Sequence, residues 1–519
     1  MKQALALLLL LGLLTPALAH PPAGATKGPS KADPILKKAA EAQKAGDTKT
    51  YEALLLEAKK ILAQEGRYSC CIKGGCAECA LEKNCGCGAN LFEKKGVCKT
   101  CLEGIKAGNG RYSAAEGVTP DMLFEQPMEM GMEMLGTLGP WRMNREGSGT
   151  TWLPDSSPMY GRMSQSGKWQ LMQMGAAFGA YTDAGGKRGD SQAYGATQYM
   201  LMGQKRTEKG DVLGLRGMFS LDALTNGKKG YPNLFQTGET ANSQPLQDRQ
   251  HPHDAIMELA ATYSRSLGGE KRGFLYLAPA GEPAIGPAAF PHRPSAWDNP
   301  AAPISHHWLD GTHITFGVAT AGVTLGDKWK LEGSAFNGRE PNEDRYGIDP
   351  IRFNSYAGRI THNPTKDLSV QASYGFLKSP ESLEPDTNAH RLTVSVMHNR
   401  ASENGDNLAS MLAFGQNQKA GHKTTNALLA ETSLTHGRQV YFVRFDSTEK
   451  DELVGVPSGT YRVQKLSLGG VHNLKQDANG QQGVGASIDL YSYPSVLKSA
   501  YGSAPVSFTL FWRWRFGRM

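Results

Sequence analysis

The C-terminal stretch of the chain, residues 506–516, constrains the fold more than any other feature. It reads VSFTLFWRWRF, with a bulky apolar side chain at every second position and mostly serine, threonine or arginine between them. Because successive side chains of a strand point to opposite faces, the pattern predicts one apolar and one polar face. The apolar set is Phe508, Leu510, Trp512, Trp514 and Phe516. A transmembrane barrel strand needs this division, with the aromatic residues toward lipid and the arginines toward the lumen.

Residues 1–19 have the features of a secretory signal peptide. A basic Lys2 precedes an apolar run, and the segment ends in Ala17-Leu18-Ala19, so cleavage is expected before His20. Mean hydropathy is −0.42, and after the N-terminus no apolar run approaches the roughly 20 residues of a membrane helix. Export together with repeated alternating segments favours an outer-membrane barrel over the alternative, a secreted soluble β-protein.

A leader and a helical hairpin are predicted over residues 20–66. The leader is rich in proline, glycine and lysine, which is typical of a flexible segment. After residue 33 apolar side chains recur at helical spacing, and Leu54, Ala58 and Ile61 fall on one face. No chemistry of its own is expected from this small scaffold.

All eight cysteines lie in a module predicted over residues 67–112. They form an adjacent pair, two CxxC motifs and one CxC motif: Cys70, Cys71, Cys76, Cys79, Cys85, Cys87, Cys98 and Cys101. An exported protein meets oxidising conditions, so disulfides would stabilise a module too small for its own core. Paired CxxC motifs are equally typical of thiolate metal sites. Both interpretations stay open.

Residues 113–166 are predicted to be a methionine-rich linker or plug. The core of this segment reads PMEMGMEML and places Met128, Met130, Met132 and Met134 at every second position. Thioethers are soft, neutral ligands, and several of them in extended geometry favour Cu(I) over hard cations. The alternative is an apolar strip buried in an interface, which is the commoner fate of methionine. The turn-forming stretch SGTTWLPDSSP, residues 148–158, is expected to plug or line the barrel mouth.

From residue 167 to residue 519 the sequence predicts a transmembrane antiparallel β-barrel of about 16 strands. Residues 392–396 and 484–490 alternate cleanly, whereas residues 461–468 lose the alternation and are expected to carry a bulge. Long and short connections take turns along the chain, as expected when both termini lie in the periplasm below long outer loops. The predicted fold class is therefore mainly β, a barrel preceded by a small helical and Cys-rich periplasmic module.

Histidines are concentrated in the two longest outer connections. The sequences DRQHPHD and SHHWLD contain two pairs, His251 with His253 and His306 with His307, and both are flanked by carboxylates. If the two loops converge, imidazole and carboxylate groups would suit Cu(II), Zn or Ni. The alternative is that these residues only hydrogen-bond the loops into the barrel mouth. With an ordinary imidazole pKa of about 6.5, such a site should lose metal in mild acid.

Four stretches resemble a largely uncharacterised family of outer-membrane proteins of Gram-negative bacteria. They read QPLQDRQHPHD, HRPSAWDNP, ISHHWLDGTHITFGV and SAFNGREPNE. The resemblance covers the chain from about Glu146 to its C-terminus. Members of that family tend to be associated with the handling of heavy metals, notably copper, and the resemblance implies a barrel with a similar role. The final Met519 departs from the aromatic terminal residue that is usual in such barrels.

The expected function is that of a non-enzymatic outer-membrane barrel that binds or passes soft heavy-metal ions, copper or zinc, with copper first. The sequence contains no GxSxG elbow, HExxH motif or phosphate loop that would indicate catalysis. A general porin with a disulfide-stabilised N-terminal module and a redox conduit across the outer membrane are the alternatives. The expected partners are outer-membrane lipid, metal ions and a periplasmic metal or electron carrier. Net charge is a modest +7 with no basic tract, so nucleic acid is not expected.

The two interpretations of the cysteines predict different masses for the native protein. A disulfide framework should lack eight hydrogens and carry no metal, whereas a thiolate site should release metal and expose free thiols on chelation. Mass spectrometry of the native chain, with a free-thiol count before and after chelation, distinguishes them. Bound metal would contradict a purely structural framework.

Overall fold

The structure is a computed structural model that describes residues 30–45, 47, 50, 53, 54, 57, 58, 61, 102 and 134–519 apart from 208, 403 and 478. The chain divides into two compact units, Met1–Gly131 and Met132–Met519. In the first unit, helix α2 (Asp33–Lys44) lies in the stretch with helical spacing. Its Ala39 is buried, and Leu36 and Leu54 pack against it. The eight cysteines and Met128, Met130 and Met132 lie outside the described residues, so their roles stay predictions.

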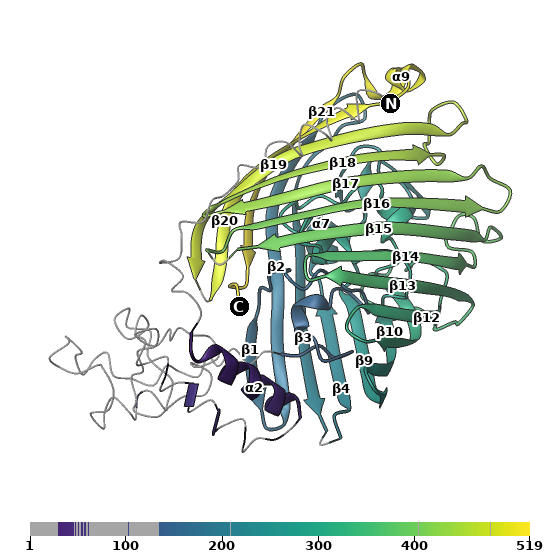
Figure 1. The fold of residues 1–519 in the computed structure, drawn as a ribbon. Coiled ribbons are helices and arrows are strands. Elements are labelled where there is room, and N and C mark those ends of the chain that lie inside the picture. Colours follow the sequence, from purple (N-terminus) through teal and green to yellow (C-terminus); the bar gives the residue numbers. More distant parts are fainter. Residues whose placement is uncertain are drawn as a thin grey trace, which may run out of the picture. The chain divides into compact units, whose positions relative to one another are not determined.

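The second unit is a closed antiparallel β-barrel (Figure 1). Its sheet contains 17 strands, of which β1 (Arg162–Ser166) pairs only with β2, so the ring consists of the remaining sixteen. The ring strands are β2 (Trp169–Ala184), β3 (Ser191–Arg206), β4 (Val212–Phe219), β9 (Ile256–Gly268), β10 (Lys271–Gly281), β11 (Thr315–Leu325), β12 (Trp329–Phe336), β13 (Ser355–Thr365), β14 (Leu368–Leu377), β15 (Ala389–Ala401), β16 (Asn407–Lys419), β17 (Thr425–His436), β18 (Gln439–Lys450), β19 (Tyr461–Asp477), β20 (Gly480–Ser492) and β21 (Val506–Arg515). The predicted mainly β fold, an antiparallel barrel of about 16 strands, is confirmed.

The ring closes between its first and last strands. Antiparallel register joins Ala176 of β2 to Arg515 of β21, and the pairing runs on to Ala184 and Ser507. Strand β1 pairs with the other half of β2, from Gln173 to Trp169. Both partners lie on the same edge of β2, so β1 occupies the length of that edge that β21 leaves free.

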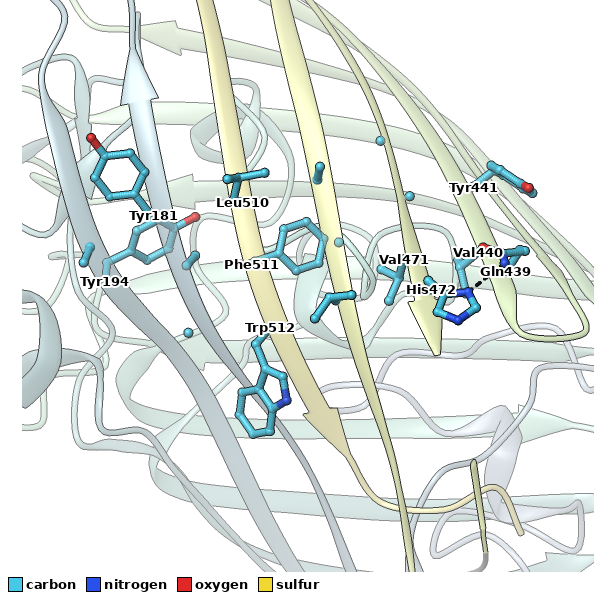
Figure 2. A pocket seen from close by; sticks show the side chains of 18 residues that line it. Tyr181, Tyr194, Gln439, Val440, Tyr441, Val471, His472, Leu510, Phe511 and Trp512 are labelled. Atoms are coloured by element: carbon cyan, nitrogen blue, oxygen red, sulfur yellow. Dashed lines mark hydrogen bonds between the residues drawn. The ribbon is translucent and has the colours of Figure 1, made fainter. Parts of the chain in front are cut away.

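The alternation in the closing strand has the predicted orientation. Leu510 and Trp512 are 55% and 42% exposed, whereas Arg513 between Trp512 and Trp514 is 0% exposed. Tyr181 of β2 pairs with Leu510 on the same outer face of the seam (Figure 2). Leu392, Val394 and Val396 of β15 are likewise exposed, and Thr393 and Ser395 are buried. An apolar outer face with a polar lumen places the barrel in a membrane.

Strand β19 corrects one sequence-based expectation. Residues 461–468 carry no bulge, because their register with β18 is continuous. Val463 and Lys465 both face the lumen, and the Lys465 ammonium lies 3.0 Å from a carboxylate oxygen of Asp489 on β20. The alternation of faces is intact there, and only the alternation of hydropathy is lost. The register of β19 with β20 shifts further along, between Asn473 and Lys475.

Connections segregate by length as predicted. One end of the barrel has short turns, such as residues 269–270 and 326–328, and the other carries loops such as 220–255 and 282–314. The long loops contain short elements: α7 (Asp222–Asn226), β5 (Tyr231–Pro232), β6 (Glu239–Ala241), β7 (Gln244–Leu246), β8 (Arg249–Gln250), η4 (Phe290–His292), α8 (His306–Leu309), η5 (Ser495–Leu497) and α9 (Lys498–Tyr501). Among the described residues, no helix is long and apolar enough to cross a membrane.

Residues 134–161, which precede β1 and include η3 (Met143–Arg145), form a plug inside the barrel. Thr150 and Trp152 of this plug are each 1% exposed. Side chains of the barrel wall hold its backbone, since Asn363 donates to the Leu153 carbonyl at 2.9 Å and Asn399 donates to the Ser156 carbonyl at 2.7 Å. The lumen is therefore a packed interior rather than an open cylinder.

The outward orientation of Trp512 predicts the effect of a charge at that position. Trp512→Arg should impair membrane assembly, because a lipid-facing cation near the midplane costs about 2–4 kcal/mol. Trp512→Phe keeps an aromatic ring on the same face and serves as the control. Heat-dependent migration of the membrane fraction measures assembly, and normal assembly of the arginine variant would contradict the lipid-facing assignment.

Candidate functional site

The two longest loops fold into the lumen and bring the predicted histidines together. His251 and His253 come from residues 220–255, and His306 and His307 begin helix α8 in residues 282–314. All four are buried. Ring centroids of His251 and His307 lie 6.2 Å apart, and those of His306 and His307 lie 5.3 Å apart. The convergence of the two loops, on which the metal interpretation depends, is therefore present.

Glu239, His251 and His307 form the tightest group of metal-ligating atoms. One ligand atom from each residue lies within 4.8 Å of the other two, and His251 Nε2 is 3.3 Å from Glu239 Oε1. His307 Nε2 is buried without a hydrogen-bond partner among the described residues. Two imidazoles and one carboxylate are a ligand set that binds transition metals in proteins. We call these three residues the triad.

Gly238 makes the close approach of His307 possible. Its φ is +105°, and a Cβ added there would lie 2.9 Å from the His307 ring. A larger residue would therefore meet both backbone strain and a clash. The glycine lets the loop that carries Glu239 come close to the imidazole.

Three further histidine side chains surround the triad. His253 Nδ1 lies 2.8 Å from Asp222 Oδ2, and His306 Nδ1 lies 2.9 Å from Asp310 Oδ1. His313, at the end of the second loop, stands with its ring centroid 5.0 Å from that of His306. Together with the triad these three histidines make a group of six residues, which we call the histidine cluster: Glu239, His251, His253, His306, His307 and His313.

The barrel wall fixes this cluster through buried ion pairs. Arg293 bridges Asp310, at 2.5 Å, and Glu431 of β17, at 2.8 Å. Asp310 in turn orients His306, so the position of the imidazole depends on the wall of the barrel. Such outer contacts fix the ring orientation of a metal-binding histidine.

Burial sets the protonation states of the triad. Desolvation lowers the pKa of His307 to about 4 and holds the pKa of His251 well below its usual range. Desolvation, together with the neighbouring Glu340, raises the pKa of Glu239 to about 7. The expectation of ordinary imidazole titration is therefore wrong, because these rings stay neutral in mild acid and keep their nitrogens available as ligands.

A cavity of about 730 Å³ opens beside the triad, and Glu239 forms part of its wall. Its acidic lining residues are Glu239, Glu340, Glu343, Asp344, Glu381, Glu384, Asp451 and Glu452. Lys419 is paired with Glu381 at 2.5 Å and also with Glu452. Desolvation and the adjacent Glu452 raise the pKa of Glu381 to about 9. We call this cavity the acidic vestibule.

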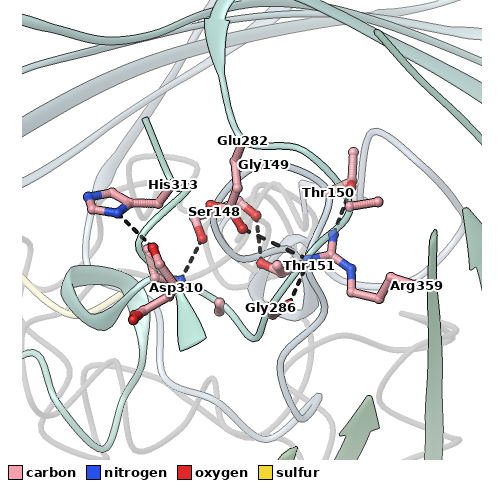
Figure 3. A network of polar contacts seen from close by, with 12 residues as sticks. Ser148, Gly149, Thr150, Thr151, Glu282, Gly286, Asp310, His313 and Arg359 are labelled. Atoms are coloured by element: carbon pink, nitrogen blue, oxygen red, sulfur yellow. Dashed lines mark hydrogen bonds and ion pairs between the residues drawn. The ribbon is translucent and has the colours of Figure 1, made fainter. Parts of the chain in front are cut away.

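The plug meets the loop that carries His306, His307 and His313 (Figure 3). Ser148 Oγ accepts a hydrogen bond from the Ala289 backbone at 2.8 Å, and Thr150 accepts one from Arg359 of β13 at 3.0 Å. Arg359 also lies 3.9 Å from Glu282, which begins the second loop. Plug, wall and loop thus form one hydrogen-bonded network.

The predicted site residues have different outcomes. The structure brings His251, His253, His306 and His307 together, and it places Met134 elsewhere in the lumen among other buried methionines. Sequence reasoning missed Glu239 and Gly238, because neither stands in a motif. Glu340 falls in the SAFNGREPNE stretch but gave no ligand signal of its own; its Oε1 lies 3.3 Å from His307 Nδ1.

No protein-family model matches the chain, and no curated protein matches its sequence. The anion-selective porin from Comamonas acidovorans has 11% sequence identity and a TM-score of 0.42, over 67% of this chain and 100% of that one. OmpF of Salmonella typhi in complex with daunomycin has 12% identity and a TM-score of 0.42, over 68% and 100%. OccAB2 of Acinetobacter baumannii has 10% identity and a TM-score of 0.38, over 67% and 98%.

The sixteen-strand ring with its apolar outer face defines a porin-like outer-membrane β-barrel. Structural similarity this distant does not indicate what this chain binds. What distinguishes this barrel lies in its own lumen, where a plug and two long loops assemble the histidine cluster.

The protonation states predict how metal affinity at the triad depends on pH. Below pH 7 the Glu239 carboxyl must lose a proton when a metal binds, whereas both imidazoles are already neutral. Apparent affinity should therefore fall about tenfold per pH unit between pH 7 and 4, and more steeply below pH 4. Cu(II) titrations between pH 4 and pH 8 measure this slope. A fall of about a hundredfold per unit beginning near pH 6.5 would show ordinary imidazoles instead.

Proposed function

We propose that this protein is an outer-membrane barrel that binds transition-metal ions in its lumen and passes them inward, with copper as the first candidate. The observation that carries the proposal is the triad, in which three ligand atoms lie within 4.8 Å of one another. Two neutral imidazoles and a carboxylate whose proton a cation can replace form a site ready for a metal ion.

The acidic vestibule supports the capture of a cation rather than an anion. Its carboxylates lie on the side of the long loops, where the barrel faces the outside. A cleft lined by one sign of charge raises the local concentration of the opposite ion. The pKa of Glu239 is raised in the absence of a cation, so a metal ion that binds there would release a proton in mild acid.

The ligand set favours copper among divalent ions. Imidazole and carboxylate sites follow the order in which Cu(II) binds most tightly and Zn(II) and Ni(II) more weakly. Geometry and availability decide the ion in the cell, so zinc is the second candidate. The copper association implied by the resembling family points the same way.

A general porin remains the competing function, because the barrel has the strand number and membrane face of one. The buried plug, and the packed core that it forms with the loops, argue against a wide unselective pore. In that core Leu153 of the plug and Leu309 of helix α8 meet Met411 and Leu429 of the wall. Passage of solutes would require these groups to move.

Copper(II) bound to the purified chain tests the triad directly. Free thiols are first alkylated so that the cysteines neither bind nor reduce the ion. Electron paramagnetic resonance should then show nitrogen coupling from imidazole. Loss of a residue that only hydrogen-bonds a metal ligand typically weakens metal binding about 10–100-fold. His251→Ala or His307→Ala should weaken copper binding by more than this. Glu239→Gln keeps the shape of the side chain and should also weaken binding.

His436→Ala is the matched control, because His436 is 72% exposed, lies on the short-turn side and is paired with Asp406. Its removal should leave the affinity unchanged. Transport is measured in proteoliposomes, where copper uptake should depend on His251 and His307. Permeation by sugars and small anions, indifferent to copper and to the triad variants, would favour the general porin and overturn the proposal.

A further inference from the structure

A second group of metal-ligating side chains lies in the lumen, apart from the histidine cluster. Seven of the eight residues in one buried core cluster are methionines: Met134, Met143, Met172, Met200, Met202, Met218 and Met257. The eighth is Ile314, and Met159, Met163 and Met174 pack against the group. We call this group the methionine cluster.

Four adjacent strands, β2, β3, β4 and β9, and the plug build it. Register pairs Met172 of β2 with Met202 of β3, and Met200 of β3 with both Met174 of β2 and Met218 of β4. Directly opposed residues share a face and stand about 5 Å apart at Cβ. Met134 and Met143 come from the plug, whose backbone joins them by a hydrogen bond of 2.8 Å. The thioethers therefore converge from the wall and from the interior.

Most of the methionine cluster lines a cavity; only Met134 and Met257 of its seven buried methionines do not. The cavity has a volume of about 80 Å³ and is lined by methionines of the plug and of strands β2, β3 and β4. His292 of η4 also lines it, and its Nε2 lies 3.2 Å from the Met218 sulfur. A few water molecules or one ion with its ligands fit a space of this size.

Packing alone does not account for this composition. Methionine fills irregular gaps in cores, but two other buried clusters of this barrel contain two methionines and none. In the core around Leu153 and Trp308, two of the nine residues are methionines, Met397 and Met411. The core around Tyr276 and Phe336 contains no methionine. The thioethers are gathered at one place in the barrel.

Three charged groups line the cavity, Glu146, Arg216 and Arg515, and each is held by partners in the barrel. Arg216 pairs with Glu258 at 2.7 Å, and Arg515 lies 3.2 Å from Asp298. Glu146 accepts hydrogen bonds from the Thr137 and Leu138 backbone at 3.0 and 2.8 Å. The soft ligands in the lining are neutral sulfurs and an imidazole, which suit a soft monovalent cation better than a hard divalent one.

We propose that the methionine cluster is a second metal site, which binds a soft monovalent cation such as Cu(I) or Ag(I) through thioethers, with His292 as a nitrogen ligand. The site does not require the triad to be occupied. It lies close to the histidine cluster, because a cavity of about 40 Å³ is lined by both His253 and Met257 and shares Pro291 and Trp297 with the methionine-lined cavity.

Residue-resolved titration of the full-length protein tests the site. All methionines carry a ¹³C label at the methyl group, and Ag(I) is the probe because it is stable to redox change. The cysteines take up Ag(I) as well, but a methyl resonance responds only to its own thioether. Single Met→Leu variants, which nearly keep the packing volume, assign the resonances. The methyl signals of Met172, Met200, Met202 and Met218 should shift together and saturate.

Met397 and Met411 provide the internal control, because they are equally buried but belong to another core. Their signals should not move. The double variant Met200→Leu/Met218→Leu should abolish the shifts of Met172 and Met202, whereas Met397→Leu/Met411→Leu should retain them. Should the first variant fail to assemble, the titration of the unaltered protein still decides.

Two outcomes would overturn the proposal. One is the absence of a shift in the methionine cluster at Ag(I) concentrations that move the signal of Met519, which is 43% exposed. The other is persistence of the shifts of Met172 and Met202 in the Met200→Leu/Met218→Leu variant. His251→Ala should leave the Ag(I) response intact, so failure of the triad and failure of the methionine site are distinguishable.

Discussion

The two-residue period of the barrel strands is the constraint from which the lumen follows. An apolar outer face uses every second residue, so the other half of each strand points inward whatever its chemistry. In this barrel those inward positions include Lys330, Arg359 and Glu431, which are almost fully buried. Buried charges need partners. The plug and the long loops supply them, and this is why the lumen is packed.

The same pairing of buried charges fixes the side-chain positions in the histidine cluster. Glu431 of the wall holds Arg293, Arg293 holds Asp310, and Asp310 orients His306. Asp222 plays the same part for His253 and itself accepts a hydrogen bond from the Thr197 backbone of β3 at 2.7 Å. Loops are usually the mobile part of a protein, but here the imidazoles of two loops are fixed by the barrel itself.

The sequence predicted the fold well because strand periodicity is local. Leu510 and Trp512 alternate with buried neighbours, and that pattern needs no knowledge of the rest of the chain. The bulge predicted in residues 461–468 was wrong because inward-facing Val463 and Lys465 interrupt the hydropathy pattern, whereas the strand geometry there is regular. The histidine pairs were visible as motifs, but their convergence depends on how two distant loops pack. Glu239 and the methionines of separate strands share no local signal, and only the register of the sheet assembles them.

The position of β1 has a consequence for how the protein is built. Because β1 continues along the edge of β2 where β21 ends, the plug is joined to the seam of the barrel through residues 162–166. The plug precedes every strand of the ring in the chain, and it lies inside the finished ring. The last strand, β21, is therefore synthesised after the segment that the ring encloses. The covalent continuation of the plug into β1 holds its C-terminal end at the seam.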